Sequence, residues 1–92
     1  MIRAKVYVYL KKDILDPQGK AVKHIIGNMG FHRIQDVRVG KYTVLTFDDS
    51  VSEEEARQQT NEICRKLLAN PVIEEYHFEL ETLPLGAPAG DG

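Results

Sequence analysis

The stretch Ile2-Arg3-Ala4-Lys5-Val6-Tyr7-Val8-Tyr9-Leu10 alternates between two kinds of side chain. A period of two residues is typical of a half-buried β-strand, because successive side chains point to opposite faces of a sheet. One predicted face consists of Ala4, Val6, Val8 and Leu10, and the other consists of Arg3, Lys5, Tyr7 and Tyr9. The apolar face needs a covering layer, which the rest of the chain is expected to supply.

A helix is predicted after this strand. Asp16 is a typical N-cap residue, and Pro17 suits the first helical position. Gly30 stands where a left-handed glycine commonly ends a helix. Between these limits, apolar side chains recur at helical spacing: Ala21, Val22, Ile25, Ile26 and Met29. This face of the helix is predicted to pack on the sheet.

Two further strands are predicted at residues 34–39 and 42–47, joined by a hairpin turn at Gly40-Lys41. Glycine at the first position of a two-residue loop suits a type II′ turn. The first of these strands alternates Val37 and Val39 with charged residues, whereas the second is apolar on both faces. One of its two apolar sets is therefore expected on the face of the sheet that the helices leave open.

A second helix and a final strand complete the predicted domain. Ser52 and Glu55 form a capping box at the helix start, and Pro71 ends the helix. The final strand directs Tyr76, Phe78 and Leu80 inward, in alternation with His77, Glu79 and Glu81. We predict one domain at residues 1–83 and a flexible C-terminal tail at residues 84–92.

The predicted order is βαββαβ, a ferredoxin-like α+β fold with a four-stranded antiparallel sheet and two helices on one face. The usual strand order, 4-1-3-2, places the last strand beside the first. Cross-strand charge pairs are then expected between Arg3 or Lys5 and the carboxylates of Glu79 and Glu81. The second face of the sheet stays open and displays Tyr7 and Tyr9, which predicts self-association or docking there.

Composition excludes several functional classes. Twelve Lys and Arg residues against 14 Asp and Glu residues, in 92, give a net charge of −2, so no basic field attracts nucleic acid or anionic lipid. The single cysteine, Cys64, excludes an intrachain disulfide and a multi-cysteine metal site. The sequence displays neither a signal-peptide pattern nor a membrane-spanning apolar run, which predicts a cytoplasmic protein.

Residues that commonly carry catalysis or bind metals are scattered along the chain. His24, His32 and His77 form no HxH or HxxxH pair, and Cys64 falls in the buried stripe of the second helix. The carboxylates of residues 53–55 are explained by helix capping. No nucleophile, base and orienting group come together. We therefore expect no catalytic residue, no metal and no cofactor in this chain.

Two segments are more specific than a structural role requires. Residues 36–42 combine a charge pair, a glycine and an aromatic residue, and residues 67–74 place an apolar run around Asn70-Pro71. The second segment fits either a buried helix–strand corner or a subunit contact. The candidate interface residues are Tyr7, Tyr9, Asp36, Arg38, Gly40, Lys41, Tyr42, Asn70, Pro71, Val72 and Ile73.

Three ordered stretches carry a family resemblance. They are Leu15-Asp16-Pro17-Gln18-Gly19-Lys20-Ala21-Val22, Asp36-Val37-Arg38-Val39-Gly40-Lys41-Tyr42 and Leu67-Leu68-Ala69-Asn70-Pro71-Val72-Ile73-Glu74. Together, and over residues 1–83, the chain resembles the PurS family, the small subunit of phosphoribosylformylglycinamidine synthase. Lys12-Asp13 departs from the Pro-Gly or similar turn expected before Ile14, which bears on that loop alone.

The resemblance implies a function in purine biosynthesis. The complex converts formylglycinamide ribonucleotide, glutamine and ATP to formylglycinamidine ribonucleotide, glutamate, ADP and phosphate. A glutaminase subunit releases ammonia, and a large synthetase subunit uses ATP and Mg²⁺ to activate the amide. The small subunit is expected to have no catalytic residue, to form a homodimer or higher oligomer, and to bridge the other two subunits. A second candidate function is a ferredoxin-like regulatory module that binds a small metabolite at a dimer interface.

Overall fold

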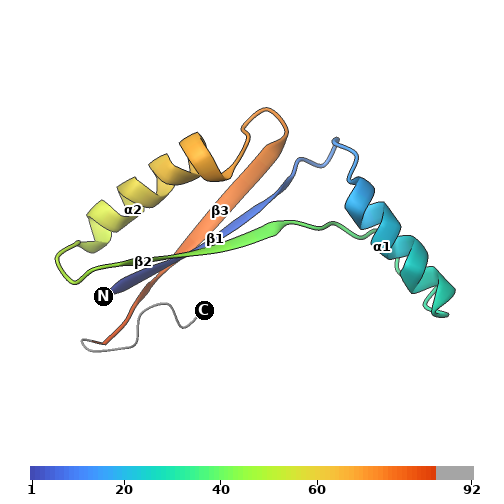
Figure 1. Cartoon of the computed structure of the whole chain (residues 1–92), viewed down its shortest axis with the longest axis horizontal. Coiled ribbons are helices and arrows are strands. Elements are labelled where there is room, and N and C mark those ends of the chain that lie inside the picture. The colour runs from blue at the N-terminus through green and yellow to red at the C-terminus, as the bar shows by residue number, and fades with distance from the viewer. Residues whose placement is uncertain (85–92) are drawn as a thin grey trace.

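The computed structural model describes residues 1–84, which have an α+β fold (Figure 1). In chain order the elements are β1 (Ile2–Leu10), α1 (Pro17–Asn28), β2 (Lys41–Phe47), α2 (Glu53–Ile63), a π-helical turn η1 (Cys64–Leu68) and β3 (Glu74–Thr82). Within these residues, no helix is long and apolar enough to cross a membrane. The predicted tail, residues 84–92, lies outside the described residues apart from Pro84.

The three strands form one antiparallel sheet in the order β2-β1-β3, with β1 in the centre. Val6 lies opposite Thr43 on β2 and opposite Phe78 on β3. The alternation predicted for the first strand is confirmed, because Val6 and Val8 are buried while Tyr9 is exposed. The predicted neighbours of β1 are also confirmed, since the last strand lies on one side and the strand around residues 42–47 on the other.

Helix α2 covers one face of the sheet and closes the core (Figure 1). The Ser52 Oγ accepts a hydrogen bond from the Glu55 backbone N–H at 3.2 Å, as the predicted cap requires. The buried face of this helix includes Ala56 and Thr60, and the following η1 turn buries Cys64. The core cluster consists of Val6, Val8, Cys64 and Ala69, with Leu45, Leu68, Tyr76 and Phe78 packed against it.

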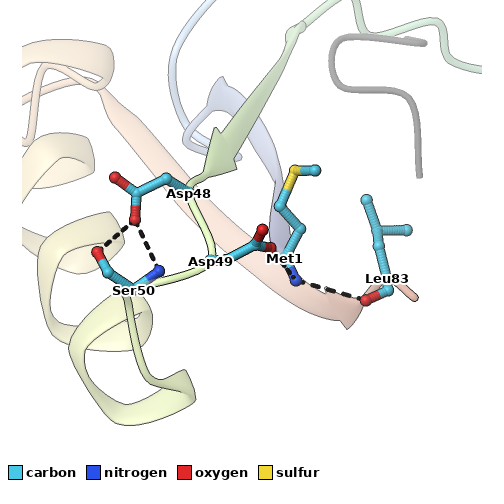
Figure 2. A network of polar contacts seen from close by, with 5 residues as sticks. All are labelled: Met1, Asp48, Asp49, Ser50 and Leu83. Carbon is cyan, nitrogen blue, oxygen red and sulfur yellow. Dashed lines mark hydrogen bonds and ion pairs between the residues drawn. The ribbon is translucent and has the colours of Figure 1, made fainter. Parts of the chain in front are cut away.

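Polar contacts join three segments at the end of the sheet far from α1 (Figure 2). The Met1 ammonium group lies 3.1 Å from an Asp49 carboxylate oxygen and donates to the Leu83 carbonyl at 3.4 Å. In the adjoining loop, the Asp48 carboxylate accepts from both the backbone N–H and the hydroxyl of Ser50, and these bonds lower the pKa of Asp48. The start of β1, the end of β3 and the β2–α2 loop are thereby connected.

The prediction of a fourth strand is wrong for the described residues, because residues 34–39 are not part of the sheet. Gly40-Lys41 does not form the predicted hairpin turn either, since the segment that returns beside α1 continues through Gly40 into β2 (Figure 1). The physical reason is a set of competing contacts. The Val39 N–H donates to the buried Asp16 carboxylate, and Arg38 donates to the Lys11 carbonyl, so this segment lies beside the β1–α1 connection.

The prediction that two helices cover one face of the sheet is also wrong. Helix α1 projects beyond the end of the sheet, and among the elements of residues 1–84 only α2 covers it (Figure 1). We call residues 16–39, which comprise α1 and the extended segment that returns from it, the arm. The Cα radius of gyration is 16.8 Å, whereas a compact chain of this length would have about 12 Å. The described residues therefore have an α+β fold with three strands, and they do not form the four-stranded sheet of a ferredoxin-like domain.

Candidate functional site

The base of the arm is organised by one buried carboxylate. Asp16 is only 4% exposed. Its Oδ1 accepts from the Gly19 N–H at 2.9 Å, and its Oδ2 accepts from the Val39 N–H at 2.8 Å. These bonds, first from Val39 and then from Gly19, lower the pKa of the Asp16 carboxyl because they stabilise its charged form. Asp16 thus joins the first turn of α1 to the far end of the arm.

Two basic side chains add contacts along the arm. The Lys23 Nζ donates to the Gln35 carbonyl at 2.6 Å, which connects α1 to the returning segment. The Arg38 guanidinium donates to the Lys11 carbonyl at 2.8 Å and remains exposed. The helix and the return of the arm therefore form one pre-organised unit.

Two predicted contact segments come together beside this base. The Lys41 Nζ lies 3.3 Å from the Leu68 carbonyl and 3.8 Å from a Glu74 carboxylate oxygen. Lys41 therefore connects the segment 36–42 to the helix–strand corner at residues 68–74. In that corner, Val72 is 75% exposed and Asn70 orders the turn by accepting from the Val72 N–H. The corner is thus exposed at Val72, whereas Ala69 before it is buried.

A hollow of about 440 Å³ lies between the arm and the sheet. It is lined by Val8, Tyr9, Leu10, Asp16, Pro17, Gln18, Val39, Gly40, Lys41 and Glu74. Lys41 and Glu74 face one another across an ion pair, and both Asp16 oxygens accept backbone N–H groups. These charged groups of the lining therefore already have partners within the chain. Asp36 and Arg38 line a neighbouring hollow with Tyr9.

The open face of the sheet has a row of aromatic rings. The Tyr7 ring lies 5.1 Å from Tyr42 on β2 and 4.7 Å from His77 on β3, between ring centroids. Tyr9 also approaches His77, at 5.8 Å. Tyr42 is 54% exposed. Among the described elements, none covers this face, so Tyr7, Tyr9 and Tyr42 remain available to a partner.

The predicted charge pairs next to these rings involve Glu81. The Lys5 Nζ lies 2.7 Å from a Glu81 oxygen, and Arg3 lies 3.8 Å from the other oxygen of that carboxylate. The Lys5 hydrogen bond lowers the pKa of Glu81, and the same contact raises the pKa of Lys5. Glu79, the second predicted partner, lies opposite Lys5 in the register. The open face is thus aromatic at one end and charged at the other.

The residues with catalytic potential remain separate from one another. Burial raises the pKa of the Cys64 thiol, which disfavours the reactive thiolate. His77 stacks on Tyr7, while His24 and His32 lie on the exposed arm. Within residues 1–84, no group of three His, Cys, Asp or Glu side chains is placed to bind a metal ion.

Sequence reasoning missed the exposed apolar surface of the arm. It treated the stripe on α1 as core, yet Ile25 is 58% exposed and Met29 is 66% exposed. Helical periodicity identifies an apolar face but not what covers it. The pattern therefore could not separate a helix face buried on the sheet from one that is exposed. Leu67, at the η1 turn, is likewise exposed.

Asp16 predicts a specific dependence of stability on pH. Because folding lowers its pKa, its ionisation stabilises the folded chain above the ordinary aspartate pKa of about 3.9, and this contribution is lost as the pH falls through the folded value. We expect Asp16→Asn to lower the unfolding temperature at pH 7, and the difference from the unsubstituted chain to shrink below about pH 4. Thermal unfolding followed by circular dichroism between pH 7 and pH 2.5 measures this. The exposed Asp13→Asn is the matched control, and an equal deficit at every pH would contradict the assignment.

Comparison with known proteins gives a consistent result. The family model described as PurS, phosphoribosylformylglycinamidine (FGAM) synthase, matches residues 3–82. The phosphoribosylformylglycinamidine synthase subunit PurS of Bacillus subtilis is 48% identical over 81 residues, which are 88% of this chain and 94% of the relative. The solved structure of B. subtilis PurS has a TM-score of 0.79 and covers 89% of this chain and 100% of its own.

A more distant structure agrees. Methanocaldococcus jannaschii PurS, described as one of the subunits of formylglycinamide ribonucleotide amidotransferase in the purine biosynthetic pathway, is 32% identical. Its TM-score is 0.80, over 91% of this chain and 100% of its own. Alignments of this extent must include most of the arm, so the projecting α1 is part of a shared fold.

Proposed function

The chain belongs to the PurS family of phosphoribosylformylglycinamidine (FGAM) synthase, and we propose that it is the non-catalytic subunit that bridges the glutaminase and the large synthetase subunit of this enzyme. The observation that carries the proposal is the family match over residues 3–82, nearly all of the described chain. Its relatives are FGAM synthase subunits of purine biosynthesis. The proposal includes a cytoplasmic location and a homodimer or higher oligomer.

The proposed division of labour follows from the groups that the chain carries. The overall reaction consumes formylglycinamide ribonucleotide, glutamine, ATP and water, and it forms formylglycinamidine ribonucleotide, glutamate, ADP and phosphate. Glutamine hydrolysis requires an activated nucleophile, and amide activation requires ATP and Mg²⁺. We assign glutamine to the glutaminase subunit, and ATP and Mg²⁺ to the synthetase subunit. This chain then needs no catalytic residue, metal or cofactor of its own.

Positioning is the contribution that remains for a bridging subunit. Ammonia is small and is mostly protonated in water at neutral pH, so a molecule that escapes from the glutaminase site loses its nucleophilic form. If the two active sites are fixed next to one another, ammonia reaches the synthetase site before it is protonated. Its effective concentration at that site is then high. A sheet with exposed aromatic residues and a pre-organised arm offers the rigid surfaces that such a bridge requires.

The contact region that we propose for the other subunits is the joined segment around Lys41. Arg38 and Lys41 present exposed positive charge there, next to the exposed apolar Val72 and Ile73. A mixed surface of this kind fits a partner with carboxylates around an apolar centre, because charges at a rim orient association while apolar contacts supply affinity. Asp36, Gly40, Asn70 and Pro71 belong to the same proposed region, and Tyr7, Tyr9 and Tyr42 form the second one.

Reversal of these charges tests the proposed contact region. We expect the double variant Arg38→Glu/Lys41→Glu to weaken binding to the glutaminase and synthetase subunits by at least about tenfold, since like charges then face one another. The measurement is copurification and binding titration with glutamine and nucleotide present. The double variant Arg57→Glu/Lys66→Glu is the control, because both side chains are exposed on α2–η1 and form ion pairs with Glu53 and Glu62, which lie four residues before them. Unchanged binding by a folded Arg38→Glu/Lys41→Glu chain would refute the contact region.

A further inference from the structure

A further hollow, of about 470 Å³, lies beside the start of β3, and we call it the β3 hollow. Its lining consists of Tyr9, Pro71, Glu74, Glu75 and Tyr76. Both charged side chains of this lining are carboxylates, and β1 and β3 each contribute one aromatic ring. Such a lining suits a positively charged group, because carboxylates attract the charge and the face of an aromatic ring attracts a cation.

Glu74 has partners in the chain, but its carboxylate can accept more hydrogen bonds. The side chain is only 16% exposed. One of its oxygens accepts from the Asn70 N–H at 2.7 Å, whereas the Lys41 Nζ lies 3.8 Å from the other oxygen, which is too far for a hydrogen bond. The same Lys41 group donates to the Leu68 carbonyl. A carboxylate that is largely removed from water is stabilised by close donors, so a donor placed in the β3 hollow would stabilise Glu74.

Glu75 and Tyr9 lie next to one another at the exposed side of the β3 hollow. They are directly opposite in the β1–β3 register, so their side chains share the open face of the sheet. Glu75 is exposed, and none of the ion pairs among residues 1–84 involves it. Tyr9 is 36% exposed, and its ring is inclined by 59° to that of His77, so the two rings are not stacked. An unpaired carboxylate therefore lies beside an aromatic ring whose faces are not stacked on that neighbour.

We propose that the β3 hollow binds an arginine side chain of a partner subunit of FGAM synthase. The inference rests on the proposed function and specifies the chemistry of the partner at one place. That place lies between the two proposed contact regions, because Pro71 belongs to the first region and Tyr9 belongs to the second.

Arginine fits the β3 hollow better than lysine because of the shape of the guanidinium group. A planar guanidinium stacks on an aromatic ring while its N–H groups form paired hydrogen bonds with a carboxylate. Tyr9 offers the ring, and Glu74 and Glu75 offer the oxygens. The ammonium group of lysine is a compact, strongly hydrated charge that cannot form this combination. In addition, β3 is an edge strand, and along its outer edge no strand among residues 1–84 pairs with its carbonyl groups.

The charges on both sides of the corner at residues 68–74 favour one orientation of the partner. Arg38 and Lys41 are exposed and attract carboxylates, whereas the β3 hollow attracts a cation. A partner surface that carries an arginine with carboxylates beside it matches this pattern in one register only. Complementary charges of this kind select a partner and its orientation, which is what a bridging subunit requires.

A double-mutant cycle in the complete complex provides the main test. We expect Tyr9→Leu and Glu75→Gln each to weaken the binding of the full chain to the glutaminase and synthetase subunits by about tenfold. The combined variant should lose clearly less than the product of the two effects, because both side chains contact the same guanidinium. Tyr9→Phe keeps the ring and should bind as the unsubstituted chain does.

Glu79→Gln is the matched control for this cycle. Glu79 is an exposed glutamate on the same strand and the same face as Glu75, but it does not line the β3 hollow. Its substitution should leave the binding unchanged. Unchanged binding of the folded Tyr9→Leu and Glu75→Gln chains would overturn the proposal, and so would fully additive effects. A lower mass of these variants in sedimentation, with unchanged binding of the subunits, would assign the hollow to a second copy and overturn the proposal as well.

A second measurement tests the β3 hollow without the partner subunits. The full chain is titrated with Nα-acetyl-arginine amide, or with Nα-acetyl-lysine amide as the matched cation, and NMR follows the Tyr9 ring and Glu75 amide signals. We expect the arginine probe at tens of millimolar to shift these signals more than the lysine probe does, and Glu75→Gln to abolish the difference. Equal shifts with both probes, or no shift with either, would overturn the proposal. Failure here is distinguishable from failure of the proposed function, which is measured by glutamine-dependent turnover with the partner subunits.

Discussion

Omission of this chain from a mixture of the glutaminase and synthetase subunits should lower the glutamine-dependent rate of FGAM formation by at least about 100-fold, because the ammonia would no longer be delivered between fixed sites. The physical reason is the loss of positioning. Without a bridge, ammonia is diluted and protonated in the solvent before it meets the activated amide. Steady-state rates with glutamine as the nitrogen donor, with and without the full chain, measure the effect.

The control for this experiment is the nitrogen donor itself. With a high concentration of ammonium salt at pH 8 or above, free ammonia reaches the synthetase from solution, and the rate should then depend far less on this chain. An equal loss with both donors would mean that the chain supports the synthetase chemistry directly. No loss with either donor would refute the bridging function, whatever the oligomeric state of the chain.

Substitution of Gly19 by alanine should strongly destabilise the arm. A Cβ at Gly19 would lie 2.1 Å from the Val37 carbonyl oxygen and 2.8 Å from the Asp16 Oδ2. A backbone oxygen cannot rotate away as a side chain can, so the clash separates α1 from the returning segment at a cost of about 3 kcal/mol. We expect the amide protons of α1 to lose protection against hydrogen exchange and the far-UV helical signal to fall, while the sheet and α2 remain protected.

Gly27 provides a matched control on the same helix. Beyond its chain neighbours and the backbone of its own helix, a Cβ at Gly27 would meet no atom within 4 Å. Because alanine is the better helix former, Gly27→Ala should leave the arm in place and stabilise α1 by up to about 1 kcal/mol. If Gly19→Ala retained the full protection of α1, the close contact with Val37 would not be the base of the arm.

Local signals in the sequence were sufficient for much of the fold. The alternation of residues 2–10 determined which side chains are buried, and the caps at Asp16 and Ser52 determined where both helices begin. The positions of Arg3 and Lys5 opposite the last strand also followed, because cross-strand neighbours depend only on register. Each of these features arises from interactions between residues a few positions apart, or from the face that a side chain occupies.

The candidate site was predicted in its parts and not in its arrangement. Residues 36–42 and 67–74 were selected as unusual segments, but their connection through Lys41, Leu68 and Glu74 is visible only in the folded chain. Of the two hydrogen bonds that the buried Asp16 carboxylate accepts, only one was predictable. Its capping bond to Gly19 follows from the helix start, whereas its bond to Val39 joins residues 23 positions apart. Long-range hydrogen bonds of this kind leave no periodic trace in a sequence.

By itself, the sequence determined the secondary structure of α1, α2 and the three strands, together with the family of the chain. Only the tertiary structure decided that the arm leaves its own sheet and that residues 34–39 do not turn back at Gly40. The reason is that an apolar face shows the same periodicity whether its own chain covers it or leaves it exposed. The choice depends on the direction of the backbone between Asp16 and Gly40, which a few distant contacts decide.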